Sequence, residues 1–194
     1  MRMATGIGAR RWDFLNGDIQ LERGSKEDYR KLSHLHYARG DPATCAGVWR
    51  AVYSDFGSRI SDFGLNSNPP TASGARIPNP KSQRVVAVAM LSYPVPSSRA
   101  REGALGLCAN RDRETLRWLN ANLRTISRVI VHPQFRALGL ASELVRRVLD
   151  DCPVRYVEAF AVMGKVVPFF TRAGMKEVSE GYFLWDREEK SNDE

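Results

Sequence analysis

The segment VHPQFRALGLASELVRRVLDD, residues 131–151, constrains the fold of this 194-residue chain more than any other. The apolar residues before Pro133 predict the end of a strand, because proline cannot continue the hydrogen-bonded ladder. Residues 139–150 then repeat apolar side chains at helical spacing, which predicts an amphipathic helix with one buried face. A strand that passes through a short basic turn into such a helix is typical of an α/β fold.

The turn between this strand and this helix has the chemistry of an anion site. The first N–H groups of a helix are unpaired and lie at the positive end of the helix dipole, so they attract a phosphate. Gly139 and Ala141 leave room for close approach, and the Arg136 guanidinium can donate two parallel hydrogen bonds to phosphate oxygens. The spacing fits neither the P-loop nor the dinucleotide fingerprint. We therefore interpret the turn as suited to a pyrophosphate.

Charge is distributed unevenly along the chain, whose formal net charge is +7. Residues 97–147 hold ten arginines against four acids, a net of +6, whereas residues 148–194 carry a net of −4. This asymmetry favours an anionic ligand near the turn. An arginine-rich solvated surface explains the charge equally well.

The rest of the chain predicts a mixed α/β sheet with helices on both faces. Strands are expected at 18–24, 46–53, 84–93, 124–131 and 154–161, with a final hairpin in 176–186. Helices are expected at 25–37, 111–123 and 139–150, with a short one before Gly174. We expect a single domain over 18–186, a mobile tail at 1–17, a long flexible loop at 54–83 and a charged tail at 187–194.

Several classes of protein are disfavoured by composition. The longest apolar run, 85–91, is seven residues long, whereas a membrane span needs about 20, so we expect a soluble protein with no membrane partner. The N-terminal segment lacks the apolar core of a secretory signal, which predicts a cytoplasmic setting. Three cysteines and three histidines without ligand spacing predict neither disulfides nor a metal site. The sequence leaves the oligomeric state open, a homodimer included.

The sequence Arg136-Ala-Leu-Gly139-Leu-Ala141, which follows the strand ISRVIVHP and opens a helix, resembles the pyrophosphate loop of the GCN5-related N-acetyltransferase superfamily. The pattern of that loop is Gln/Arg-x-x-Gly-x-Gly/Ala. Residues 157–178, VEAFAVMGKVVPFFTRAGMKEV, resemble the family's next strand, short helix and aromatic turn. The resemblance covers 125–178 closely and 18–93 only in element order. It implies a mixed, mostly antiparallel twisted sheet with a V-shaped gap between two parallel central strands.

The resemblance also implies a cofactor, acetyl-CoA or another acyl-CoA, lying between strands 124–131 and 154–160. Its pyrophosphate would bind backbone N–H groups of the loop, its pantetheine would pair with Ile130 and Val131, and an amide near Val129 or Ile130 would polarise the thioester. The implied cofactor-binding residues are Val129, Ile130, Val131, Arg136, Ala137, Leu138, Gly139, Leu140, Ala141 and Ser142.

Two catalytic positions that many family members use are vacant in this sequence. The strand TISRVIVH, residues 125–132, contains no carboxylate to serve as base, and Phe170 stands where the family has a tyrosine that protonates the leaving thiolate. Since an alkyl amine with a pKa near 10.4 is mostly protonated at neutral pH, a replacement base is expected elsewhere.

Four residues are candidates for that replacement. Glu158 lies in an otherwise apolar strand, where burial would raise its pKa, although such a carboxylate can equally face solvent. His36 and Tyr37 follow the first helix, where the family closes over the acceptor, although a histidine there often caps carbonyls. Ser127 could hold a water molecule.

Three functions follow from these observations. An acyl-CoA-dependent N-acyltransferase acting on a small-molecule or protein amine is the leading hypothesis. A member of the superfamily that modifies a DNA base or tRNA is favoured by the arginine-rich surface. A noncatalytic acyl-CoA-binding module is favoured by the vacant catalytic positions.

Overall fold

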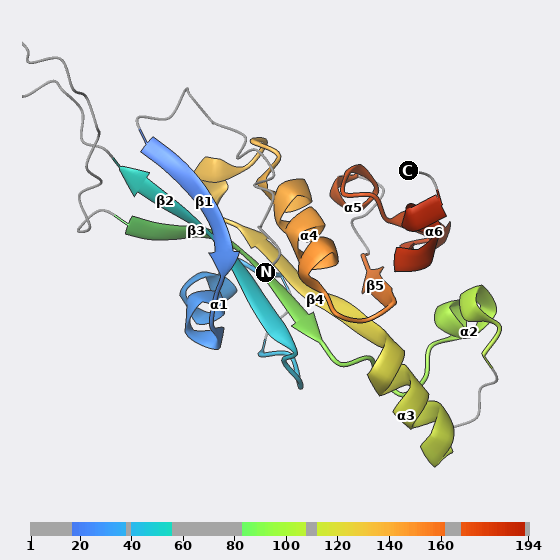
Figure 1. Cartoon of the computed structure of the whole chain (residues 1–194). Helices are drawn as coiled ribbons and strands as arrows, with labels where there is room; N and C mark the ends of the chain where they lie inside the picture. The colour runs from blue at the N-terminus through green and yellow to red at the C-terminus, as the bar shows by residue number, and fades with distance from the viewer. Residues whose placement is uncertain (1–16, 38–39, 56–82, 108–111, 162–167, 193–194) are drawn as a thin grey trace, which may run out of the picture.

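The computed structural model describes residues 17–37, 40–55, 83–107, 112–161 and 168–192 (Figure 1). The strands form a single sheet in the order β1-β2-β3-β4-β5-β7-β6. They are β1 (Gly17–Arg23), β2 (Gly47–Asp55), β3 (Gln83–Ser92), β4 (Leu123–Val131), β5 (Tyr156–Phe160), β6 (Lys176–Ser179) and β7 (Tyr182–Asp186). The helices are α1 (Lys26–Ser33), α2 (Arg99–Leu105), α3 (Arg113–Asn122), α4 (Leu140–Asp151), α5 (Phe169–Arg172) and α6 (Arg187–Asn192), with a 3-10 turn at Pro133–Phe135.

Only β4 and β5 pair in parallel; the other neighbouring strands run antiparallel. The parallel pairing is short and joins Leu123–Ile126 to Tyr156–Ala159. β4 then continues to Val131, whereas β5 ends at Phe160. From Ser127 onward β4 therefore has no strand partner on its β5 side among the described residues, which is the predicted separation of two parallel central strands.

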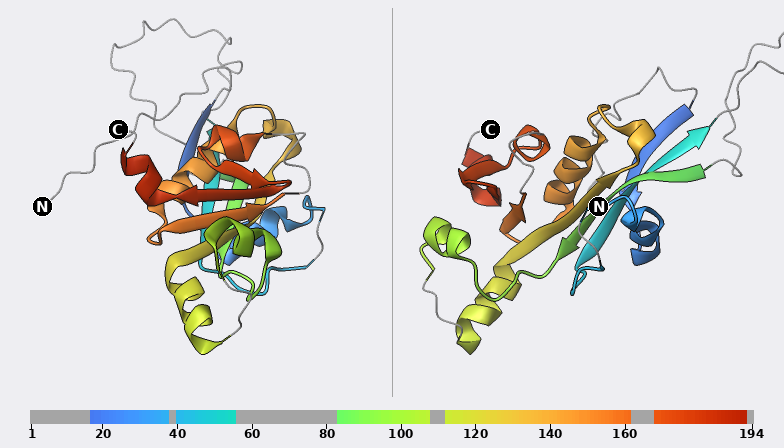
Figure 2. Two further views of the ribbon diagram at one scale, coloured as in Figure 1. Left: turned by 90° about the vertical axis from the view of Figure 1, so that its right-hand side faces the viewer. Right: turned by 180° about the vertical axis from the view of Figure 1, so that it is seen from behind.

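Helices cover both faces of the sheet, as predicted. α4 packs on one face with the larger apolar cluster, which includes Val129, Val157 and Ala159, and α1 packs on the other with Ile130 and Met90 (Figures 1 and 2). Because side chains alternate along a strand, Val129 and Val131 of β4 point toward α4 and Ile130 points toward α1.

A β-bulge interrupts β4 at the point where it leaves β5. Met90 of β3 pairs with Arg128 and Leu91 pairs with Ile126, so Ser127 is an extra residue on β4. A bulge redirects the side chains beside it. Ser127 and Arg128 consequently both lie on the α1 face of the sheet, where the Ser127 hydroxyl meets that of Ser92.

Two helices were not predicted. α2 is short and lacks an apolar stripe, so the sequence gives no periodic signal for it. α6 occupies most of the segment predicted to be a charged tail, and the predicted helix 25–37 ends as α1 at Ser33. The predicted tail at 1–17 and loop at 54–83 lie outside the described residues except at their edges. No helix in the described part is long and apolar enough to cross a membrane.

Candidate active site

The turn between β4 and α4 is built from left-handed backbone. Gly139, the N-cap residue of α4, has φ of 79°, and Ala137 two residues earlier has φ of 64°, the one positive φ outside glycine among the described residues. A Cβ added at Gly139 would meet nothing within 4 Å, so the space beside it is open. No side chain caps α4, which leaves its first N–H groups free of a side-chain acceptor. The turn therefore presents backbone donors to an open space.

The side chains around this turn divide into two groups. Leu140 and Ser142 are buried, so only their backbone atoms are available to a ligand. Arg136 and Ala137 are exposed, and the Nε of Arg136 donates to the carbonyl of Val131 at 3.3 Å. The predicted cofactor residues at 136–142 thus lie together at the C-terminal end of β4.

The register of β4 decides which of its amides face the β5 side. His132 N–H donates to the Val86 carbonyl, and in an antiparallel ladder hydrogen-bonded and non-hydrogen-bonded pairs alternate. Ile130 and Arg128 therefore direct their backbone groups to β3, while Val129 and Val131 direct theirs to the β5 side. This register favours Val129 over Ile130 for polarising a thioester, and Val131 over Ile130 for contacting pantetheine.

Glu158 is fully buried at 0% exposure, and its carboxylate belongs to a network that joins four elements. Arg101 of α2 binds it with two hydrogen bonds, Nε to Oε2 at 2.9 Å and Nη2 to Oε1 at 2.6 Å. The Thr125 hydroxyl of β4 donates to Oε1 at 2.7 Å, and the Tyr182 hydroxyl of β7 donates to Oε2 at 3.1 Å. Burial, followed by the charge of Glu158, raises the pKa of Tyr182 above its ordinary value.

This network fills the hydrogen-bonding capacity of the Glu158 carboxylate. Each of its oxygens accepts two hydrogen bonds, and a carboxylate has about four lone-pair sites. The sequence left open whether Glu158 is buried or faces solvent, and it missed Arg101, which looks like its arginine-rich neighbours. The available signal was the buried acid itself, because a carboxylate in an apolar strand needs a cation from elsewhere in the chain.

Ser127 lies at the β4 bulge in a chain of hydroxyl groups. Its Oγ is 2.7 Å from that of Ser92, which donates to the Thr44 carbonyl at 2.7 Å. Because the single proton of Ser92 serves Thr44, the Ser127 hydroxyl is the donor toward Ser92. It also lies 3.2 Å from the Met90 carbonyl, to which it can donate instead, and in both cases its lone pairs can still accept. The predicted role of Ser127 as a holder of water fits this geometry.

The histidines occupy different places. The rings of His36 and Tyr37 stack at 4.5 Å after the end of α1, and Tyr37 is 74% exposed instead of turned toward the sheet. His132 caps the 3-10 turn by accepting from the N–H of Gln134 and also meets Arg84. Burial and the charge of Arg84 lower the pKa of His132.

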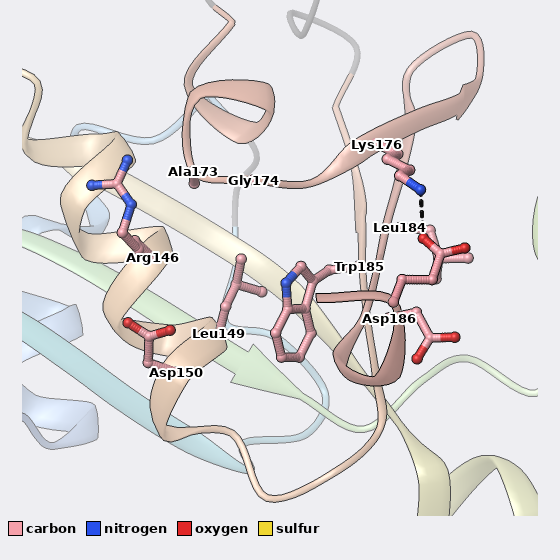
Figure 3. Close-up of a pocket in the computed structure, with 10 residues that line it drawn as sticks. Arg146, Leu149, Asp150, Ala173, Gly174, Lys176, Leu184, Trp185 and Asp186 are labelled. Carbon is pink, nitrogen blue, oxygen red and sulfur yellow. Dashed lines mark hydrogen bonds and ion pairs between the residues drawn. The ribbon is translucent and has the colours of Figure 1, made fainter. Parts of the chain in front are cut away.

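A surface hollow lies away from these residues. It has a volume of about 180 Å³ and is lined by the C-terminal half of α4, the start of β6, β7 and α6 (Figure 3). Its lining mixes Leu149 and Trp185 with charged groups such as Lys176 and Asp186. None of the predicted site residues lines it. The described residues also contain no group of three or more His, Cys, Asp or Glu side chains able to bind a metal.

No protein-family model and no curated protein matches this sequence. Among solved structures, the chain is similar to Arabidopsis thaliana NAA60 in complex with acetyl-CoA, with a TM-score of 0.51 and 14% identity over 87% of this chain and 99% of that one. It is also similar to a GNAT family acetyltransferase from Brucella melitensis in complex with acetyl-CoA, with a TM-score of 0.46 and 9% identity over 87% and 88% of the two chains. The KacTA–DNA complex gives a TM-score of 0.45 at 14% identity over 91% and 100%. The likeness to NAA60 shows the fold, and the predicted fold class is confirmed.

Proposed function

We propose that this chain, whose fold is that of the GCN5-related N-acetyltransferases, transfers an acetyl group from acetyl-CoA to an amine. The observation that carries the proposal is the left-handed backbone at Ala137 and Gly139, which opens the N-terminus of α4 beside the unpaired edge of β4. A pyrophosphate would bind the N–H groups of this turn, and Arg136 would add a charged donor. The pantetheine would lie along the β4 edge.

The chemistry of the transfer assigns roles to residues of β4. The amine nitrogen attacks the thioester carbonyl carbon, the C–S bond breaks, and CoA leaves as a thiolate that takes a proton from solvent. The Val129 N–H would donate to the thioester oxygen as negative charge develops there. A water molecule that donates a hydrogen bond to the Ser127 Oγ would take the proton that the attacking amine loses.

The remaining residues considered for catalysis have no assigned step in this reaction. Glu158 stays a prediction as a base, but its contacts support a role in holding α2 against the sheet. His36 and Tyr37 stay predictions as groups that meet the acceptor. Phe170 is buried and packs against Phe183 at 5.1 Å, so it serves the core.

Calorimetric titration of acetyl-CoA into the wild type and Gly139→Glu tests the proposal. The added side chain would occupy the open space, repel the pyrophosphate and strain the left-handed backbone, so we expect at least about a hundredfold weaker binding. Gly40→Glu is the matched control, because Gly40 has φ of 82° and nothing within 4 Å of an added Cβ. Failure of the folded wild type to bind acetyl-CoA would overturn the proposal.

An acceptor carried on nucleic acid is the second candidate function. Exposed arginines on α2 and α3 favour it, namely Arg99, Arg113 and Arg117. Phosphate contacts from such side chains would make binding to DNA or tRNA fall steeply with added salt. Binding measured at several salt concentrations, followed by acetyl transfer to the bound nucleic acid, would separate this candidate from a small-molecule acetyltransferase. Acetyl-CoA binding without transfer to any acceptor would indicate a noncatalytic module.

A further inference from the structure

Arg128 lies where an acceptor would meet the cofactor in the proposed reaction. It is the β4 residue directly after the Ser127 bulge and directly before Val129, and it pairs with Met90 of β3. Met90 and Ile130 on either side of it belong to the apolar cluster under α1. The Arg128 side chain therefore lies on the α1 face of the sheet, the face that also carries Glu158.

The Arg128 guanidinium is only partly satisfied. Its Nη1 donates to the carbonyl of Ser127 at 2.7 Å, whereas its Nε is buried and has no hydrogen-bond partner. Nε is also the one buried side-chain nitrogen or oxygen in the described part of the chain that lacks a partner. A buried donor without a partner costs about 1–3 kcal/mol, and more when it carries charge.

The protein does not supply an anion for this cation within the described residues. The two buried carboxylates there both have cations of their own: Glu158 pairs with Arg101, and Asp28 pairs with Lys31 and Arg50. Arg128 forms no ion pair with any residue that the structure describes. Arg128 itself is half-buried, but its buried Nε costs free energy unless some group accepts a hydrogen bond from it, and this favours an anionic ligand there.

We propose that Arg128 binds an oxyanion of the acceptor, so that the acceptor is a short amine that also carries a carboxylate or a phosphate. This inference rests on the proposed acetyl transfer. The amide assigned to the thioester, that of Val129, belongs to the next residue of β4. An acceptor whose oxyanion binds Arg128 would therefore approach the thioester from the α1 face of the sheet.

Paired acceptors that differ in the anion test this directly. Release of CoA thiol is measured for glycine against glycinamide, and for O-phosphoethanolamine against ethanolamine, with the wild type, Arg128→Gln and Arg128→Lys. We expect the anionic member of at least one pair to have a kcat/KM about tenfold to a hundredfold higher in the wild type. Arg128→Gln should abolish that preference and Arg128→Lys should restore part of it. The pair that shows the preference identifies the anion as carboxylate or phosphate.

Arg124→Gln is the matched control, because Arg124 lies on the same strand but donates to the carbonyls of Asn120 and Leu123 and covers the ring of Tyr93. It should leave the preference unchanged, and the dissociation constant for acetyl-CoA should be unchanged in every variant. Equal rates within both pairs, or a preference that survives in Arg128→Gln, would overturn the inference while acetyl-CoA binding leaves the proposed function standing. Loss of acetyl-CoA binding by the wild type would overturn both.

A binding measurement covers the case in which none of these amines is acetylated. The protein is first saturated with CoA, which occupies the pyrophosphate turn, and is then titrated with inorganic phosphate or acetate. We expect binding in the wild type and in Arg124→Gln and its loss in Arg128→Gln. Equal titration of the wild type and Arg128→Gln would overturn the inference.

Discussion

The two halves of the candidate site are built in different ways. The cofactor half, residues 136–142 with the free edge of β4, consists of backbone donors fixed by left-handed residues close together in sequence. The acceptor half, on the α1 face of the sheet, consists of side chains brought together from distant elements. Arg101 and Glu158, for example, lie 57 residues apart. The cofactor half is therefore encoded locally, and the acceptor half depends on the tertiary fold.

The acceptor half also contains two arginines whose guanidinium groups differ: Arg101 is buried and paired, and Arg128 is half-buried with an unpaired Nε. Arg101 is 1% exposed and binds the Glu158 carboxylate with two hydrogen bonds. Arg128 has a buried Nε with no partner in the described chain. Arg101 thus stabilises the fold by pairing with Glu158, whereas Arg128, on the same face, is left to bind a ligand.

The largest effect should come from removing Arg101. Arg101→Leu would leave the Glu158 carboxylate buried without its cation, so the free energy of unfolding should fall by about 3–5 kcal/mol. Urea unfolding measures the loss. Arg99→Leu, an exposed position on the same helix, should change stability by less than about 0.5 kcal/mol. If both variants lost a similar amount of unfolding free energy, the ion pair between Arg101 and Glu158 would not be what makes Arg101 differ from Arg99.

A second variant separates the ion pair from packing. In the double variant Arg101→Leu with Glu158→Gln no buried charge is left behind, so it should be more stable than Arg101→Leu alone. If the double variant is instead less stable by the full sum of the two single losses, the coupling between these side chains is absent.

The next effect concerns how α1 is held over the acceptor face. Asp28 is 3% exposed, and hydrogen bonds from Lys31, Ser25 and Arg50 outweigh its burial and lower its pKa from 3.8 to about 2. Because the folded-state pKa is the lower one, this stabilisation is complete well above pH 3.8 and is lost as the pH falls toward 2. The shift corresponds to about 2 kcal/mol.

Unfolding free energies measured from pH 6 to pH 2 check this prediction. Asp28→Asn should be less stable than the wild type near neutrality, and the difference should shrink as the pH falls. Asp41→Asn removes an exposed acid whose contact with Arg30 is 3.8 Å long, and it should have little effect at any pH. Parallel pH curves for the wild type and Asp28→Asn would show that Asp28 does not hold α1.

The same contrast explains what could be predicted from the sequence. The strand, turn and helix over 124–151 follow from apolar periodicity, Pro133 and Gly139, all of which act within a few residues. The apolar strand around Glu158 follows as well, although the pattern leaves open whether the carboxylate is buried or faces solvent. The partner of Glu158 does not, since Arg101 lies on a short helix without a stripe and no local pattern distinguishes it from Arg99. The bulge at Ser127, which turns Arg128 toward α1, depends on the pairing with β3 and is equally invisible in the sequence.

The smallest effect is expected in the cofactor half, where backbone N–H groups would bind the ligand. A left-handed conformation costs a residue with a Cβ about 1–2 kcal/mol, and the extra freedom of glycine in the unfolded chain costs about 0.5–1 kcal/mol. Ala137→Gly should therefore raise the free energy of unfolding by about 0.5–1 kcal/mol and leave acetyl-CoA binding within about twofold, as urea unfolding and calorimetry would measure. Ala121→Gly, in the last turn of α3, should instead lower stability by about 0.5 kcal/mol, because there the residue is helical. If Ala137→Gly destabilises the protein as Ala121→Gly does, the left-handed backbone at Ala137 is not what shapes the turn, and the cofactor half would depend on tertiary contacts as the acceptor half does.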